Sequence, residues 1–262
     1  MLSLLAHQFR HAARQLAANP GFSLFAALSL AIGIGASITL FSVAETLLFA
    51  PLRGVGAPDD LVELSSVSPT RTSDAFSAPD FADYETRAAD VANVFAWRHQ
   101  WMNVDVAGKP ERAFGLIVSG NYFGALEVGA FRGRLLARDD DREGAAPVAV
   151  ATYAGWRKYL DGDEAAIGKT VSINGQSFTL VGVAAPDFRG TVAVLTPAFY
   201  VPLAQQPRLQ PGAADLRSQR GSAWLSLGAR LLPGTTRALA RERLSSIDRP
   251  KHSGARPARS PR

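Results

Sequence analysis

Residues 22–49 read FSLFAALSLAIGIGASITLFSVAETLLF, a continuous apolar run of 28 residues. A helix rises about 1.5 Å per residue, and a bilayer core about 30 Å thick needs roughly 20 apolar residues to cross it. Its one ionisable residue, Glu45, would lie at the far interface and avoid the cost of the hydrocarbon core. A cleaved signal peptide is the alternative, but its apolar region is typically about 7–15 residues. The run therefore predicts a transmembrane helix over residues 20–50.

The charges beside this span predict its orientation. Arg10 and Arg14 precede the span with no acidic residue before it, and acidic residues outnumber basic ones just after it (Asp59, Asp60 and Glu63 against Arg53). The positive-inside rule then places the N-terminus in the cytoplasm and everything after residue 51 outside it. The chain contains no cysteine, so its extracytoplasmic fold must depend on an ordinary apolar core.

Residues 1–19 predict an amphipathic helix. Leu2, Leu5, Phe9 and Leu16 recur at helical spacing, and Asn19-Pro20-Gly21 breaks the pattern just before the span. A helix lying in the cytoplasmic interface, followed by an elbow into the membrane, suits this pattern. One continuous helix with a kink is the alternative.

Within the span, small residues recur every four positions in two stripes. The predicted helix-packing residues are Ala27, Ala31, Gly35, Ser29, Gly33 and Ser37. Small faces let helix backbones approach closely in lipid, where apolar side chains gain nothing by leaving apolar tails. The stripes predict packing against another membrane helix, although small residues are also common in such helices generally.

The formal net charge of +5 comes from the end of the chain. From Arg237 onward there are eight basic residues against two acidic ones, which leaves a charge of −1 elsewhere. A basic surface for nucleic acid is therefore not expected on the folded part of the chain. Residues 248–262 are basic, proline-rich and without periodicity, so we predict a disordered tail there.

Residues 51–130 predict alternating strands and helices. The expected elements are a strand at 61–67, a helix from Ser77 or Asp80 to Arg87, a hairpin of 91–106 with 112–118, and a short helix at 121–126. Such an order buries its apolar faces as an α+β layer structure.

Residues 131–222 predict a β-rich lobe inserted into that structure. The expected elements are a strand at 147–151, a helix at 153–160, a hairpin of 171–173 with 178–183 through Asn174-Gly175, and a strand at 199–203. Residues 205–222 are polar and predict a linker back to the first part. Residues 223–247 supply that part's last strand and a helix capped by Thr235 or Thr236.

An ordered series of short motifs resembles MacB-type, FtsX-like ABC transporter permeases over roughly residues 1–245. The series comprises Asn19-Pro20-Gly21-Phe22, Gly33-Ile34-Gly35, Gly120-Asn121-Tyr122-Phe123, Gly129, Gly133-Arg134, Asp139-Asp140, Trp156, Ile167-Gly168-Lys169, Val181-Gly182-Val183, Phe188, Val201-Pro202-Leu203, Ala229-Arg230-Leu231 and Pro233-Gly234.

The resemblance implies an inner-membrane protein with a porter-like α/β periplasmic core domain and an inserted β-rich lobe. It implies a dimeric permease, contact with membrane lipid, and a separate cytoplasmic ATPase whose ATP hydrolysis drives export or mechanical work outside the cytoplasm. It also implies no catalytic residue, cofactor or metal in this chain.

The resemblance has one departure. Such permeases have three further spans after the core domain, and no second apolar run follows here. We expect a truncated permease component whose second core part is incomplete, as a frameshift or premature end would give; a genuine basic tail is the alternative. A single-pass anchored binding or scaffold module, or a nonfunctional permease remnant, is the alternative function.

Several segments imitate chemical sites. Gly162 to Thr170 resembles a Walker A loop but has five residues between its glycines and precedes a predicted strand, so Lys169 is expected in a solvated turn. Asp139, Asp140 and Asp141 lack the alternation of an EF-hand loop and predict a solvated turn or a helix cap.

The remaining candidates are no more specific. His7, His11, His99 and His252 do not form a zinc set, and no Gly-x-Ser-x-Gly elbow is present. We expect the four tryptophans to pack in the core or at an interface rather than line a ligand groove: Trp97, Trp101, Trp156 and Trp224.

Overall fold

The computed structural model describes residues 19–48, 53–68, 71–106, 108–191, 195–212 and 214–248. The chain divides into two compact units, residues 1–50 and 51–262. The interfacial helix predicted for residues 1–19 and the tail predicted for 248–262 fall almost wholly outside the described residues.

The first unit contains helix α2, Pro20–Leu48. Proline suits a first helical position because its fixed φ is helical and its missing N–H would have no partner there. At 29 residues the helix is about 44 Å long, which exceeds a bilayer core. In the described part of the chain it is the one helix long and apolar enough to cross a membrane, over Pro20–Ser42. The side chain of Glu45 lies outside the described residues.

The second unit mixes helices and strands, as predicted. Its elements in chain order are η1 (Pro58–Asp60), β1 (Leu61–Leu64), β2 (Ser66–Ser68), β3 (Arg71–Ser73), α3 (Ala78–Arg87), β4 (Ala92–Val106), β5 (Lys109–Val118), α4 (Tyr122–Leu126), β6 (Ala130–Gly133), η2 (Arg138–Asp141), β7 (Val148–Ala151), α5 (Tyr153–Tyr159), η3 (Glu164–Ala166), β8 (Thr170–Ile173), β9 (Gln176–Ala184), β10 (Phe199–Pro202), η4 (Leu203–Gln205), α6 (Gln206–Leu209), β11 (Ser226–Leu231) and α7 (Arg237–Asp248).

Local sequence signals account for several of these boundaries. Ser77 caps α3 in a capping box: its hydroxyl accepts from the Asp80 N–H, and the Asp80 carboxylate accepts from the Ser77 N–H, both at 3.2 Å. Asn174 and Gly175 have φ values of 54° and 73° and join β8 to β9, as Asn-Gly predicts for a tight hairpin. The Thr236 hydroxyl accepts from the Leu239 N–H at the start of α7.

The main sheet of the described residues has nine strands in the order β1-β11-β4-β5-β10-β7-β9-β6, with β8 paired to both β4 and β9. The pairs β5–β10 and β7–β9 are parallel and the others antiparallel. Strands β2 and β3 form a separate two-stranded ribbon. The predicted strand at 61–67 is therefore wrong as one element, because the chain changes sheets at Ser65.

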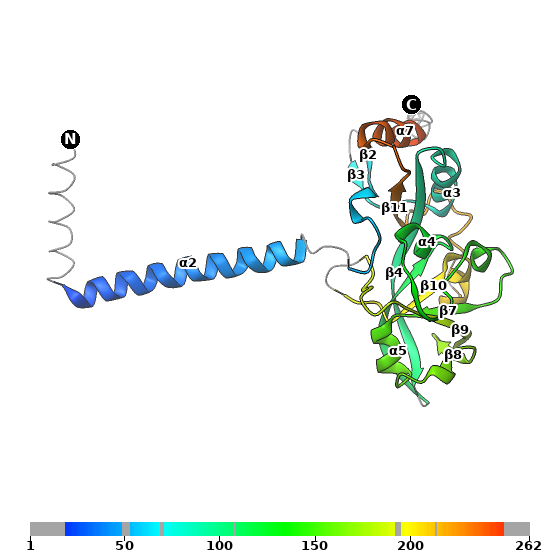
Figure 1. The fold of residues 1–262 in the computed structure, drawn as a ribbon, viewed down its shortest axis with the longest axis horizontal. Coiled ribbons are helices and arrows are strands. Elements are labelled where there is room, and N and C mark those ends of the chain that lie inside the picture. The colour runs from blue at the N-terminus through cyan, green and yellow to red at the C-terminus, as the bar shows by residue number, and fades with distance from the viewer. Residues whose placement is uncertain are drawn as a thin grey trace, which may run out of the picture. The chain divides into compact units, whose positions relative to one another are not determined.

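Strand β4 connects two parts of this sheet. Its 15 residues extend about 50 Å, more than one short neighbour can pair with. The first half pairs with β11 from Ala92 to Trp97, and the second half meets β8 at Val104 and Ile173. The β8 contact closes a ring of paired strands, β4-β5-β10-β7-β9-β8, which we call the β4 ring. Helices α3 and α7 lie at one end of the unit and α5 and β8 at the other (Figure 1).

Apolar side chains cover both faces of the sheet. Alternate residues of β4 enter different clusters: Ala96 joins the one that includes α3 and α7, while Phe95 and Trp97 join the one that includes α4. The first cluster continues into the β4 ring, where Ile173, Phe178 and Phe199 are completely buried. The strands of residues 131–222, predicted as an inserted lobe, thus continue the sheet of the preceding residues. Residues 205–222, predicted as a linker, also contain α6, whose Gln206 and Leu209 are buried.

Candidate functional site

The small residues predicted to pack in the membrane all lie on α2. Ser37 donates to the Gly33 carbonyl at 2.9 Å and Thr39 to the Gly35 carbonyl at 2.8 Å, so both hydroxyls are satisfied within the helix. A Cβ placed on Gly33 or Gly35 would meet nothing within 4 Å. Both faces are open to a neighbouring helix, and their packing stays a prediction.

A buried arginine joins three parts of the second unit. Arg230, on β11, has a side chain only 10% exposed. Its guanidinium donates to the Gly56 carbonyl at 2.5 Å and to the Ala57 carbonyl at 3.1 Å, and its Nε donates to the Ala125 carbonyl of α4. Glu127 Oε2 lies 3.8 Å from Arg230 Nη1. A buried charge is tolerated when its polar atoms are bonded in this way.

Close backbone approach fixes the segment that Arg230 holds. Gly54 has a φ of +72°, and a Cβ there would lie 2.6 Å from the Phe188 nitrogen, so only glycine is accommodated without a shift. The Gly56 N–H donates to the Leu126 carbonyl at 3.1 Å. Residues 54–57 are therefore held from two sides.

The same segment leads directly into the sheet. Strand β1 pairs with β11 so that Leu61 lies opposite Arg230. Arg237, at the start of α7, donates to the Asp59 carbonyl at 2.9 Å. The first described residues of this unit and its last strand and helix thus meet at one place. We call Gly54–Asp60, Ala125 and Arg230 the β1–β11 junction.

Arg230 stands in the motif Ala229-Arg230-Leu231, and the motif by itself indicates no role for it. The sequence does carry one signal, an arginine among the small and apolar residues of Leu227–Leu231, which are all buried in the structure. A charge at such a position predicts burial with bonded partners. Its partners, far away in the sequence, could not be named.

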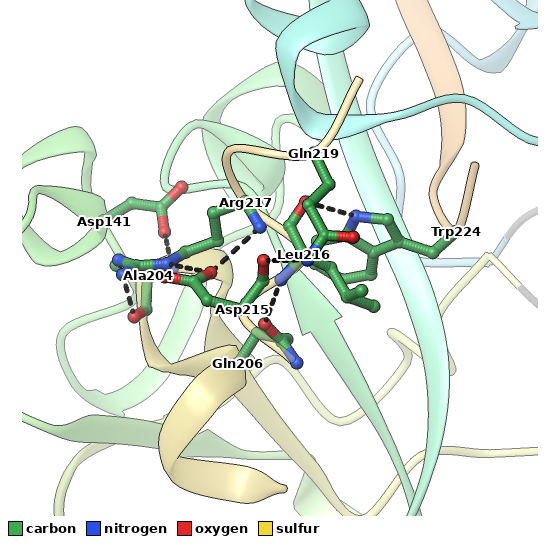
Figure 2. Close-up of polar contacts among 8 residues, drawn as sticks. All are labelled: Asp141, Ala204, Gln206, Asp215, Leu216, Arg217, Gln219 and Trp224. Carbon is green, nitrogen blue, oxygen red and sulfur yellow. Dashed lines mark hydrogen bonds and ion pairs between the residues drawn. The ribbon is translucent and has the colours of Figure 1, made fainter. Parts of the chain in front are cut away.

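A second polar cluster is formed by residues between Ala204 and Trp224, together with Asp141 (Figure 2). Trp224 Nε1 donates to the Leu216 carbonyl at 3.3 Å, and the Leu216 N–H donates to Gln206 Oε1 at 3.2 Å. Arg217 forms a bidentate pair with Asp215, with Nη2–Oδ2 at 2.7 Å and Nε–Oδ1 at 3.0 Å. This pairing lowers the pKa of Asp215 and raises that of Arg217. The described residues of this predicted linker therefore connect β10 to β11 and are held by side-chain hydrogen bonds.

The sequence predicts a solvated turn or a helix cap at Asp139–Asp141. The helix cap is confirmed at Asp140, whose carboxylate accepts from the Ala137 N–H at the start of η2, whereas a solvated turn is wrong for Asp140 and Asp141. Asp140 accepts two bonds from Arg134, at 2.6 and 2.8 Å, and one from the Ala137 N–H at 2.8 Å. The hydrogen bonds of Arg134 hold the pKa of Asp140 below its usual value. Asp141 is half-buried and accepts from the Gly120 and Ala204 N–H groups, and desolvation raises its pKa to about 6. Asp140 and Asp141 face inward because η2 packs against the turn at Gly120 and against η4.

The other candidates lie apart from one another. Lys169 is 64% exposed beside Asp163, and Thr170 begins a strand, so the Walker-like segment has no helix to bind phosphate. Among the described residues, no three of His, Cys, Asp and Glu gather as metal ligands would. His99 packs on Phe114, and desolvation lowers its pKa.

The tryptophans divide between core and surface. Trp97 and Trp156 are buried, and Trp224 packs against the core. Trp101 is 50% exposed, so it does not lie in the core, and its packing at an interface stays a prediction. Trp101 lies on the same face of β4 as Phe95 and Trp97, which pack with α4. The Cζ atom of Arg112 lies 4.6 Å from the centroid of the Trp101 ring.

Comparisons with known proteins agree on one fold. The sequence profile of the MacB-like periplasmic core domain family matches residues 23–247. The periplasmic region of MacB from Actinobacillus actinomycetemcomitans aligns with a TM-score of 0.56 and 17% identity, covering 76% of this chain and 86% of that one. The extracellular domain of the ABC-type transporter YknZ from Gram-positive bacteria aligns with a TM-score of 0.51 and 14% identity, covering 74% and 93%. No curated protein matches the sequence.

Proposed function

The chain belongs to the family of MacB-like periplasmic core domains, and from this premise we propose that it is a noncatalytic permease component of an ABC transporter. In this proposal α2 spans the inner membrane with its N-terminus in the cytoplasm, and the second unit is periplasmic. The charges flanking the span support this orientation. A separate cytoplasmic ATPase supplies the energy.

The β1–β11 junction is the observation that carries the proposal. Movement of α2 would reach the second unit through the residues that follow it, and Arg230 bonds two of these, Gly56 and Ala57, to β11 and α4. A guanidinium bonded in this way resists displacement, because moving it would break three hydrogen bonds at once, and the bond to the Ala125 carbonyl is buried. The junction is therefore suited to pass a displacement into the sheet rather than absorb it.

The small-residue stripes of α2 support an assembly within the membrane. Gly33 and Gly35 leave room for a second backbone, and lipid offers no better contact at such a face. We propose that these stripes pack against a membrane helix of a second copy or of another subunit, with lipid covering the rest of α2. We also propose a division of the second unit. Residues 51–130 and 223–247 form its core part, and residues 131–222 form the inserted part.

Co-purification tests the proposal. The full chain, tagged and extracted in mild detergent from its own host, should bring down a protein with Walker A and Walker B motifs, and a variant lacking residues 1–18 should not. Recovery of a stable chain without any such ATPase would overturn the permease assignment. It would favour a single-pass anchored binding or scaffold module, which the one candidate span among the described residues also suits.

A further inference from the structure

Arg98, on β4, has a guanidinium without a partner in the described part of the chain. Its Nη1 atom is buried, and no described residue accepts a hydrogen bond from it. Burial lowers the pKa of Arg98, and no carboxylate of a described residue acts against this effect. Arg230 on the adjacent strand β11 is buried too, but three carbonyls accept from its guanidinium. A buried donor without an acceptor costs free energy, so Arg98 requires an explanation that Arg230 does not.

Trp224 lies against one face of this guanidinium. The Arg98 Cζ atom lies 5.4 Å from the centroid of the Trp224 ring. The alternation of side chains along β4 places Arg98 on the same face as Ala96, and its partner on β5 is the buried Ile117. Of the three guanidinium nitrogens only Nη1 is buried without a partner, so Nε and Nη2 keep contact with solvent. The Nε–Nη2 edge of Arg98 is therefore the side that a ligand can reach.

Three glutamine side chains connect the Trp224 segment to β4. The Leu216 N–H, whose carbonyl accepts from Trp224, donates to Gln206 Oε1 (Figure 2). Gln206 Nε2 donates to Gln210 Oε1 at 3.3 Å, and Gln210 Nε2 donates to Gln100 Oε1 at 3.0 Å. Each glutamine oxygen thus accepts from a group other than the nearby arginine of β4. The polar side chains beside that arginine hold one another and leave its N–H donors unused.

The acidic side chains of the segments next to Trp224 are paired with other arginines. Asp215 pairs with Arg217 at 2.7 Å, and Asp83 pairs with Arg220 at 2.6 Å. Within the described ranges, no acid lowers the cost of burying the charge of Arg98. This part of the chain therefore leaves one positive charge partly removed from water and unbalanced.

We propose that Arg98 and Trp224 form a binding site for a small oxyanion, a carboxylate or a phosphate, which the Nε–Nη2 edge of the guanidinium holds through two N–H groups. Such an edge presents two parallel donors that match two oxygens of one ligand. The indole ring lies against the guanidinium face and keeps it in place through a cation–π contact. The site involves neither α2 nor an ATPase, so its failure would leave the proposed function untouched.

Titration calorimetry on the full chain in detergent micelles tests the site. Sodium phosphate and sodium acetate are the two probes, titrated separately at neutral pH with sodium chloride holding the ionic strength constant. At least one probe should bind saturably, and the probe that binds more tightly identifies the class of ligand. Arg98→Met should weaken that binding by about 10-fold or more, because hydrogen bonds to a charged group are lost. Absence of saturable binding of both probes to the wild-type chain would overturn the proposal.

A matched control separates this site from other basic groups, including the basic residues after Arg237. Arg112 also lies over a tryptophan ring, that of Trp101, but it is exposed, so Arg112→Met should keep the wild-type affinity. Undiminished binding in Arg98→Met, or an equal loss in Arg112→Met, would assign the anion to other residues and overturn the proposal. If Arg98→Met fails to fold, Arg98→Gln, which is also uncharged and suits the neighbouring amides, takes its place with the same expected loss.

Discussion

The two halves of β4 are stabilised by different chemistry. The first half pairs with β11, which pairs with β1, and a buried arginine bonds that end to the residues before β1. The second half belongs to the β4 ring, where Phe178, Ile173 and Phe199 form an apolar interior. Hydrogen bonds of a buried charge are directional and fix one position, whereas apolar packing is not directional. A segment that transmits a displacement needs directional hydrogen bonds of this kind, because they fix one position.

The largest expected effect lies in the β4 ring. Phe178→Ala removes a completely buried aromatic side chain and should destabilise the second unit by about 4 kcal/mol, through lost burial and the cavity left behind. Denaturant unfolding in detergent, followed by tryptophan fluorescence, measures this, because all four tryptophans lie in the second unit. A loss below about 1 kcal/mol would mean that the ring is loosely packed.

Arg230→Met should cost somewhat less, about 3 kcal/mol. Methionine replaces the aliphatic stem but removes the donor to the carbonyls of Gly56 and Ala125, and it leaves the Ala57 carbonyl with the Asp60 N–H alone. The same unfolding measurement applies, and hydrogen exchange should rise at residues 54–60 and not at β8. Arg230→Lys keeps the charge with fewer donors, so its free energy of unfolding should lie between those of the wild-type chain and Arg230→Met. Wild-type stability in Arg230→Met would remove the polar half of the comparison.

Asn174→Ala tests whether the β4 ring also needs a polar element. Asn174 has a φ of 54°, its side chain accepts from the Asn103 N–H and donates to the Leu209 carbonyl, both at 2.7 Å, and alanine can do neither. We expect a loss of about 2 kcal/mol from strain and lost bonds. Asn174→Gly, which relieves the strain alone, should recover part of this. Equal stability of all three chains would contradict the expectation.

Arg243→Met is the smallest change. Arg243 pairs with Asp90 at 2.6 Å, but both side chains are about half exposed. Surface ion pairs contribute little because water screens them. No measurable shift in the unfolding midpoint is expected, which makes this variant the matched control for Arg230→Met. A loss as large as that of Arg230→Met would show that burial does not distinguish the two arginines.

Local signals predicted much of the fold. The capping box at Ser77 and Asp80, the Asn174-Gly175 turn and the apolar run of α2 act within a few residues, so their consequences can be read along the chain. The family resemblance, carried by motifs in order, is also confirmed. Packing of the α2 stripes stays a prediction.

The long-range contacts of the fold could not be predicted from the sequence. The pairing of Val104 with Ile173, which closes the β4 ring, joins strands whose alternation fits several partners. In the sequence Asp140 and Asp141 resemble solvated acids, and only the packing of η2 buries Asp140 and half-buries Asp141. Arg230 carried a signal of burial, but its acceptor carbonyls lie over 100 residues away. Such partners follow from topology and not from local pattern.

A distance measurement from the β1–β11 junction to η3 tests the central claim most directly. The chain has no cysteine, so spin labels at Asp59→Cys and Glu164→Cys would be unique. With the partner ATPase in nanodiscs, their distance distribution should differ between the nucleotide-free and the ATP–vanadate states, and Arg230→Met should abolish the difference while Arg243→Met keeps it. Identical distributions in both nucleotide states of the wild-type chain would contradict the claim that movement enters the periplasmic unit through this junction.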